Sequence, residues 1–154
     1  MKEFRFVVNE EILKKLNIDS SKAKDFIDYY LARNKRVRHF LPSESRKEEF
    51  LLIVAEPGMT IKRKVKIGSE EAKNLISEAE LIVKKKGIGH LKANGTEGYA
   101  ERVSAFKAGE REPIFEEIQI EFEVGEDKMK NLEKAIKPLS IIKKGIFDYI
   151  SERI

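Results

Sequence analysis

Positively charged residues recur two positions apart at several places in the chain, for example at Lys62, Lys64 and Lys66. In a β-strand this spacing puts side chains on one face. If such a face lines an interior, its cations are stable only beside carboxylates, water or an anionic ligand. The pattern therefore predicts a site for an anionic, phosphate-rich ligand such as a polyphosphate, with a solvent-exposed face of the sheet as the alternative. The candidate ligand-binding residues are Arg36, Arg38, Lys62, Lys64, Lys66, Lys84 and Lys86.

A second set of candidate residues is acidic. Glu117 and Glu121 belong to one alternating segment with Gln119 between them, so their side chains are expected on the same face of a strand. Hard cations such as Mg²⁺ and Mn²⁺ prefer oxygen ligands. We therefore consider Glu117 and Glu121, together with Glu3, as a candidate metal site, with a salt-bridged polar face as the alternative. No catalytic residue is assigned, and a metal is expected only if the protein is an enzyme.

Hydrophobic periodicity and turn residues indicate which elements position these side chains. Eight strands joined mostly by hairpins predict an α+β fold, either an eight-stranded antiparallel β-barrel or a strongly curved sheet, with flanking helices. Glycines between residues 87 and 95 are interpreted as a long loop. The expected strands span residues 3–8, 26–32, 36–41, 49–55, 60–67, 80–86, 99–106 and 114–124, and the expected helices span 10–16, 69–79, 127–137 and 139–152.

The composition narrows the class of protein. The 154 residues contain no cysteine, which excludes disulfides and zinc–thiolate sites. No apolar run reaches the roughly 20 residues that cross a bilayer, so a cytoplasmic protein without membrane contact is expected. No linker or repeat divides residues 1–154, which predicts a single domain. A charged fraction of 38% with one glutamine resembles the composition of heat-adapted proteins.

The charges are also unevenly distributed. Residues 33–66 contain ten Lys or Arg and four Glu, whereas residues 110–127 contain eight acids and only Arg111 as a base. A domain with one basic and one acidic stretch can pair them internally or offer the basic surface to an anion.

Several short segments resemble the CYTH superfamily, the triphosphate tunnel metalloenzymes, and the similarity in element order covers nearly the whole chain. The matching segments are Arg36-Val37-Arg38, the basic strand leading to a helix at Ser69, Lys84-Lys85-Lys86, and Glu117-Ile118-Gln119-Ile120-Glu121. The resemblance implies a tunnel whose basic residues bind a triphosphate and whose glutamates hold Mg²⁺ or Mn²⁺ for hydrolysis. The family's Glu-x-Glu-x-Lys signature is missing from the first strand, where only Glu3 and Arg5 stand.

Two other functions are consistent with the same residues. A non-catalytic module could bind RNA or another polyanion through an external basic face. A structural partner protein could instead use its charges as internal ion pairs. The sequence leaves the ligand and the oligomeric state open.

Overall fold

The computed structural model describes residues 2–55 and 62–154. Their contacts form two compact units, each of which is described by itself. The first unit comprises the N-terminal segment through Lys24, Lys86–Val103 and Glu116–Arg153; the second comprises Asp25–Lys85 and Ser104–Phe115. Strands β7 (Leu81–Ala93) and β8 (Thr96–Lys107) contribute residues to both units. The assignment of residues 1–154 to a single domain stays a prediction.

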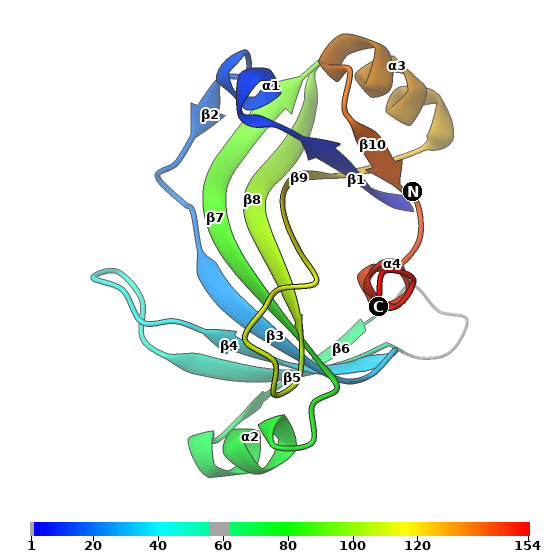
Figure 1. The fold of residues 1–154 in the computed structure, drawn as a ribbon. Helices are drawn as coiled ribbons and strands as arrows, with labels where there is room; N and C mark the ends of the chain where they lie inside the picture. Colours follow the sequence, from blue (N-terminus) through cyan, green and yellow to red (C-terminus); the bar gives the residue numbers. More distant parts are fainter. Residues whose placement is uncertain (1, 56–61) are drawn as a thin grey trace. The chain divides into compact units, whose positions relative to one another are not determined.

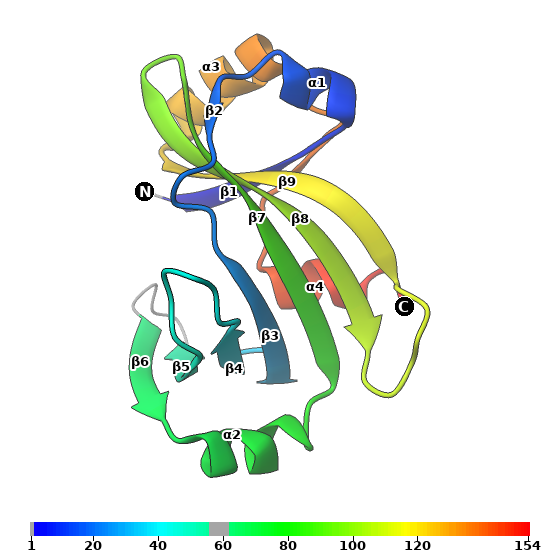
Figure 2. The ribbon, with the colours of Figure 1, turned by 90° about the vertical axis from the view of Figure 1, so that its left-hand side faces the viewer.

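The first unit is a layer of antiparallel strands with helices α1 and α3 against its apolar face (Figures 1 and 2). β1 pairs with β9 on one side and with β10 on the other, both antiparallel. β8, β7 and then β2 continue the strand order beyond β9. The further elements are β1 (Lys2–Val8), α1 (Glu10–Lys14), β2 (Ile18–Asp19), β9 (Phe115–Val124), α3 (Glu126–Ile136), β10 (Ser140–Ile142) and α4 (Ile146–Ser151).

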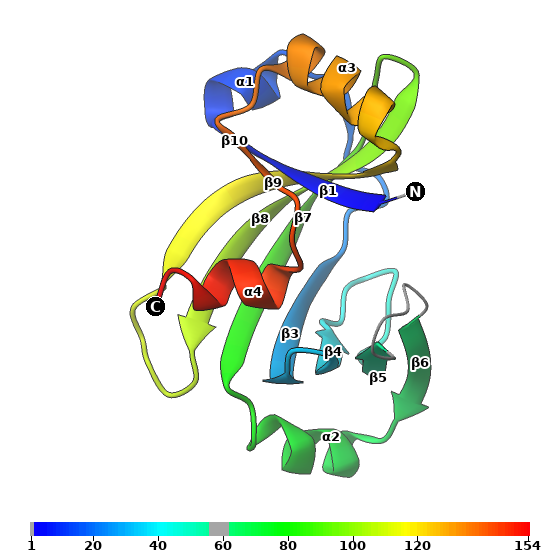
Figure 3. The same cartoon turned by 90° about the vertical axis from the view of Figure 1, so that its right-hand side faces the viewer.

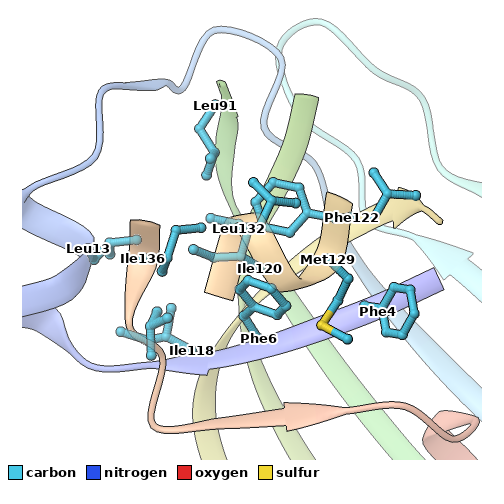
Figure 4. Close-up of a cluster of buried hydrophobic side chains, with 13 residues drawn as sticks. Phe4, Phe6, Leu13, Leu91, Ile118, Ile120, Phe122, Met129, Leu132 and Ile136 are labelled. Atoms are coloured by element: carbon cyan, nitrogen blue, oxygen red, sulfur yellow. The ribbon is translucent and has the colours of Figure 1, made fainter. Parts of the chain in front are cut away.

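Alternate apolar residues of β1 and β9 build the core of this unit. Phe6 and Phe122 meet edge to face, with ring centroids 5.3 Å apart. Met129 and Leu132 of α3, at helical spacing, pack on the same cluster (Figure 4). The opposite face of β1 carries Arg5, as the sequence predicts.

The second unit is a four-stranded antiparallel meander with helix α2 on one face (Figure 3). Val37 and Phe50 of the sheet pack against Ala72 of the helix. Gly68 precedes the helix, and Glu70 and Glu71 in its first turn favour the positive end of the helix dipole. The elements that lie wholly in this unit are β3 (Asp25–Ala32), β4 (Lys35–Phe40), β5 (Glu49–Ala55), β6 (Lys62–Ile67) and α2 (Ser69–Ile76); the part of β7 up to Lys85 and the part of β8 from Ser104 also belong to it.

The α+β, predominantly antiparallel architecture is confirmed, but the closed eight-stranded barrel is wrong. The described residues form ten strands whose order begins at β10 and ends at β6, so the sheet is open. The additional strands are the short β2 and β10, whose two and three residues are too few to give a periodic signal. The predicted turn at residues 56–59 and the first two residues of the strand predicted at 60–67 lie outside the described residues.

Two further element predictions are wrong for identifiable reasons. The expected loop at 87–95 is mostly strand, because β7 continues to Ala93 and only Asn94-Gly95 turns, both with positive φ. Gly87 lies within β7, and the position requires glycine because a Cβ there would lie 2.2 Å from the Tyr99 hydroxyl oxygen. The expected helix at 139–152 is instead β10 followed by α4, which begins after Gly145. Among the described residues, no helix has the length and apolar character needed to span a membrane.

Candidate anion-binding site

Arg36 and Arg38 lie on the same face of the second unit's sheet as the lysines of β6. Arg38 is opposite Leu51, and Leu51 in turn is opposite Lys66. The same registration connects Arg36 to Lys64 through the central strand β5. Residues opposite each other in antiparallel strands project from the same face. The cations of β4 and β6 therefore lie on one face of this sheet, a relation between strands that the sequence left open.

Helix α2 covers the other face of this sheet, where Val37 and Leu52 pack. Lys62 is opposite Ala55 and falls on the cationic face with its two neighbours. All three lysines of β6 are exposed, and the side chain of Lys66, 76% accessible, lies 3.4 Å from a Glu49 oxygen. We call the set Arg36, Arg38, Lys62, Lys64, Lys66 and Lys85 the basic face of the second unit.

Asp28 is a fully buried carboxylate in the middle of this face. Arg38 donates two hydrogen bonds to it, of 2.8 and 3.0 Å. Arg36 Nε lies 3.3 Å and Lys85 Nζ 3.9 Å from Asp28 Oδ2. One negative charge is thus shared by three positive ones, so these four groups together carry a net charge of +2.

These neighbours keep Asp28 ionised. Burial by itself would raise the pKa of this carboxyl, because it disfavours the charged form. The hydrogen bonds from Arg38 and the charges of Lys85, Arg38 and Arg36 outweigh burial, so the pKa lies below its ordinary value. The carboxylate therefore stays negative throughout the physiological pH range.

The sequence analysis assigned Lys84 and Lys86 to the site, but the structure places Lys85 beside Asp28. Lys85 is only 4% exposed, whereas Lys84 and Lys86 are exposed. Val83 and Leu81, two and four residues before Lys85, are also buried. Lys84 and Lys86 are two residues apart and were therefore predicted to share the ligand-binding face of the strand. Lys85 instead continues the buried row of Leu81 and Val83. A buried lysine in an apolar row, together with Asp28 in the apolar strand β3, was the signal that could have identified both residues.

Aromatic rings hold the two arginines in place. The Arg38 guanidinium carbon lies 4.2 Å from the centroid of the Phe26 ring, and that of Arg36 lies 5.5 Å from the Tyr30 ring. Both arginine side chains are 15% exposed. Because stacking and the shared carboxylate restrict these side chains, little further ordering is needed for them to meet an anion.

The acidic candidates are in the first unit, where they surround Arg5. Arg5 donates hydrogen bonds of 2.8 Å to both Glu101 and Glu121 and longer ones of 3.2 Å to Glu3 and Gln119. Burial alone would lower the pKa of Arg5, but the three carboxylates raise it above its ordinary value. Glu101, which is 2% exposed, was not among the predicted site residues.

The predicted metal ligands do not share a common point. Glu3 and Glu121 contact Arg5, whereas both carboxylate oxygens of Glu117 accept hydrogen bonds from the Tyr149 hydroxyl, at 3.0 and 2.9 Å. Burial and the Glu117 carboxylate raise the pKa of Tyr149, so it remains a donor. Nowhere in the described part of the chain do three or more His, Asp or Glu residues gather as a metal site requires. We therefore derive no metal-dependent step.

Comparisons with known proteins support the fold. No family model and no curated protein sequence matches the chain. It is similar to the structure of a conserved hypothetical protein from Pyrococcus furiosus, with a TM-score of 0.56, 17% identity, and coverage of 96% of this chain and 98% of the other. It is also similar to the PH1012 protein from Pyrococcus horikoshii OT3, with a TM-score of 0.56, 15% identity, and coverage of 93% and 94%. At these identities the likeness concerns the fold alone.

Proposed function

We propose that this protein binds a triphosphate or another phosphate-rich ligand on the basic face of the second unit. The observation that carries the proposal is the sharing of the buried Asp28 carboxylate by Arg36, Arg38 and Lys85. Three cations around one carboxylate attract a further anion, and arginine forks match phosphate oxygens geometrically. The resemblance of the sequence to triphosphate tunnel proteins points to the same ligand class.

The lysines of β6 favour an extended anion over a single small one. Alternate residues of a strand are roughly 7 Å apart, so Lys62, Lys64 and Lys66 form a row of charges along the strand. A linear ligand with several negative groups could contact this row and the arginines two strands away. A single carboxylate or phosphate could engage only part of the set.

Protection of the sheet edge would explain only part of this charge. β6 ends the strand order, and lysines on an edge strand oppose pairing with another chain. That role requires neither Arg36 and Arg38, on a strand with partners on both sides, nor the buried Lys85. Ligand binding accounts for the exposed lysines and the buried cations together.

The exposure of the three lysines favours RNA or another external polyanion as a second candidate ligand. Such binding would weaken steeply with salt, with a slope of log K against log salt near −0.7 per phosphate contacted for a single strand. Buried arginine–phosphate contacts are screened less. The dependence of affinity on salt and on ligand type therefore distinguishes these candidates.

Binding is proposed to be independent of divalent metal, because Arg5 occupies the centre of the acidic cluster. Triphosphate hydrolysis with Mg²⁺ or Mn²⁺ is a separate proposal from the sequence resemblance. Release of phosphate from tripolyphosphate, measured with metal-stripped protein before and after adding each ion, tests it directly.

The binding proposal is tested by calorimetric titration of tripolyphosphate into metal-stripped protein. Lys64→Gln should weaken binding about two- to five-fold, the effect of losing one exposed ionic contact. Arg63→Gln is a matched control, because Arg63 is on the same strand but faces the other way. The proposal fails if the wild type does not bind, or if both variants weaken binding equally. Tight binding of single-stranded RNA without tripolyphosphate binding would favour the second candidate.

A further inference from the structure

Cations and aromatic rings alternate along the basic face and continue into the loop between β4 and β5. Lys85 Nζ lies 5.4 Å from the Phe26 ring centroid, and the Arg38 guanidinium carbon lies 4.2 Å from the same centroid. The Phe26 and Phe40 rings are 5.5 Å apart. Arg46 follows, with its guanidinium carbon 4.0 Å from the Phe40 centroid. The row thus extends from a buried lysine to an arginine at the surface.

The position of Arg46 on this face follows from its contact with Phe40. Phe40 is opposite Phe26 in the β3–β4 ladder and two residues from Arg38, so its ring lies on the basic face. The loop is held by backbone hydrogen bonds between Ser43 and Arg46, of 2.8 and 3.2 Å. Arg46 is therefore placed by a closed turn and by a ring.

Among the residues that the structure describes, no carboxylate neutralises the Arg46 guanidinium. Within residues 2–55 and 62–154, its side chain makes no hydrogen bond or ion pair, and its guanidinium lies over the Phe40 ring. Glu48, two residues away, is paired with His39 at 2.8 Å. A guanidinium stacked on a ring keeps its edge N–H groups available for an incoming anion.

We propose that Arg46 is the outer arm of the anion site and sets its preference for linear phosphate chains. This inference rests on the proposed function and specifies its ligand. A single phosphate at Arg36 and Arg38 does not extend to the loop. A longer chain placed at the same arginines follows the row of rings outward and meets Arg46 with a further phosphate. Affinity should then rise with chain length, and Arg46 should carry part of that rise.

The test is calorimetric titration with orthophosphate, pyrophosphate and tripolyphosphate at constant ionic strength. We expect Arg46→Gln to weaken tripolyphosphate binding about ten-fold, the effect of one charge-assisted contact, while orthophosphate binding changes less than two-fold. Lys47→Gln, which removes an exposed charge from the next position of the loop, is the matched control and should alter neither. Thermal unfolding of each variant verifies that the loop substitutions leave the fold intact.

The outcomes separate this inference from the proposal beneath it. If the wild type binds tripolyphosphate and Arg46→Gln behaves like Lys47→Gln, the role of Arg46 is overturned and the basic face is retained as the site. An equal loss for all three phosphates would also overturn it, because Arg46 would then not discriminate chain length. If the wild type binds no phosphate, both statements are overturned.

Discussion

Replacing Asp28 by Asn tests the electrostatic balance of the basic face. The substitution preserves the shape of the side chain but removes the negative charge that Arg36, Arg38 and Lys85 share. Removing one partner of a buried ion pair costs about 3–5 kcal/mol. We expect the lower end, about 3 kcal/mol, because the arginines are 15% exposed and water screens part of the repulsion. The melting temperature should fall by about 6–12 °C.

Urea unfolding followed by circular dichroism measures this change, with Glu44→Gln at an exposed loop position as the control. Tripolyphosphate should restore stability to Asp28→Asn, by about 2.7 kcal/mol at one hundred times the dissociation constant. Acid should also act differently on the wild type and on Asp28→Asn. Because folding lowers the pKa of Asp28, its ionised carboxylate contributes fully to the wild-type stability above the unfolded-state pKa near 3.8. This contribution disappears as the pH falls through the folded-state pKa. If Asp28→Asn lowers the free energy of unfolding by less than about 1 kcal/mol at neutral pH, the Asp28 carboxylate does not balance the charges of Arg36, Arg38 and Lys85.

Two further substitutions probe the acidic cluster of the first unit. Arg5→Met should lower the free energy of unfolding, measured in urea, by about 3–5 kcal/mol, because it leaves Glu101 buried without its cation. The control Arg102→Met removes an exposed ion pair with Glu10 and should cost under about 1 kcal/mol. Equal losses in the two variants would contradict the distinction between the buried and the exposed pair. Tyr149→Phe should cost about 1–3 kcal/mol because both hydrogen bonds to Glu117 are lost, and an unchanged urea midpoint would show that this contact does not hold α4.

Alternation along the strands was the part of the fold most readily predicted. Glu3 and Arg5 project from the face of β1 opposite to that of Phe4 and Phe6, because successive side chains of a strand alternate between its two faces. The same rule placed Arg36 with Arg38, and the lysines of β6 with one another, but only the register through β5 shows that the two sets share a face. The open edges of the sheet could not be predicted, because closure depends on strand pairing far apart in the sequence and not on local pattern.

The centre of the candidate site was missed for a different reason. Asp28 and Lys85 each stand in a row of alternate buried residues, and a search for repeated charges does not use that signal. Their meaning appears only when the fold brings them within 3.9 Å of each other. Similarly, three carboxylates spaced as metal ligands proved to surround Arg5 or to bind Tyr149, contacts that link distant segments.

The most direct test of the basic face locates the bound phosphate by NMR. Arginine Nε–Hε resonances, assigned through Arg→Lys variants, are recorded while tripolyphosphate is added to metal-stripped protein. The account predicts that the signals of Arg36 and Arg38 shift in a saturable manner, while that of Arg63, on the opposite face, stays in place. Saturable shifts at Arg63 with none at Arg36 and Arg38, or no saturable shift at all, would contradict it.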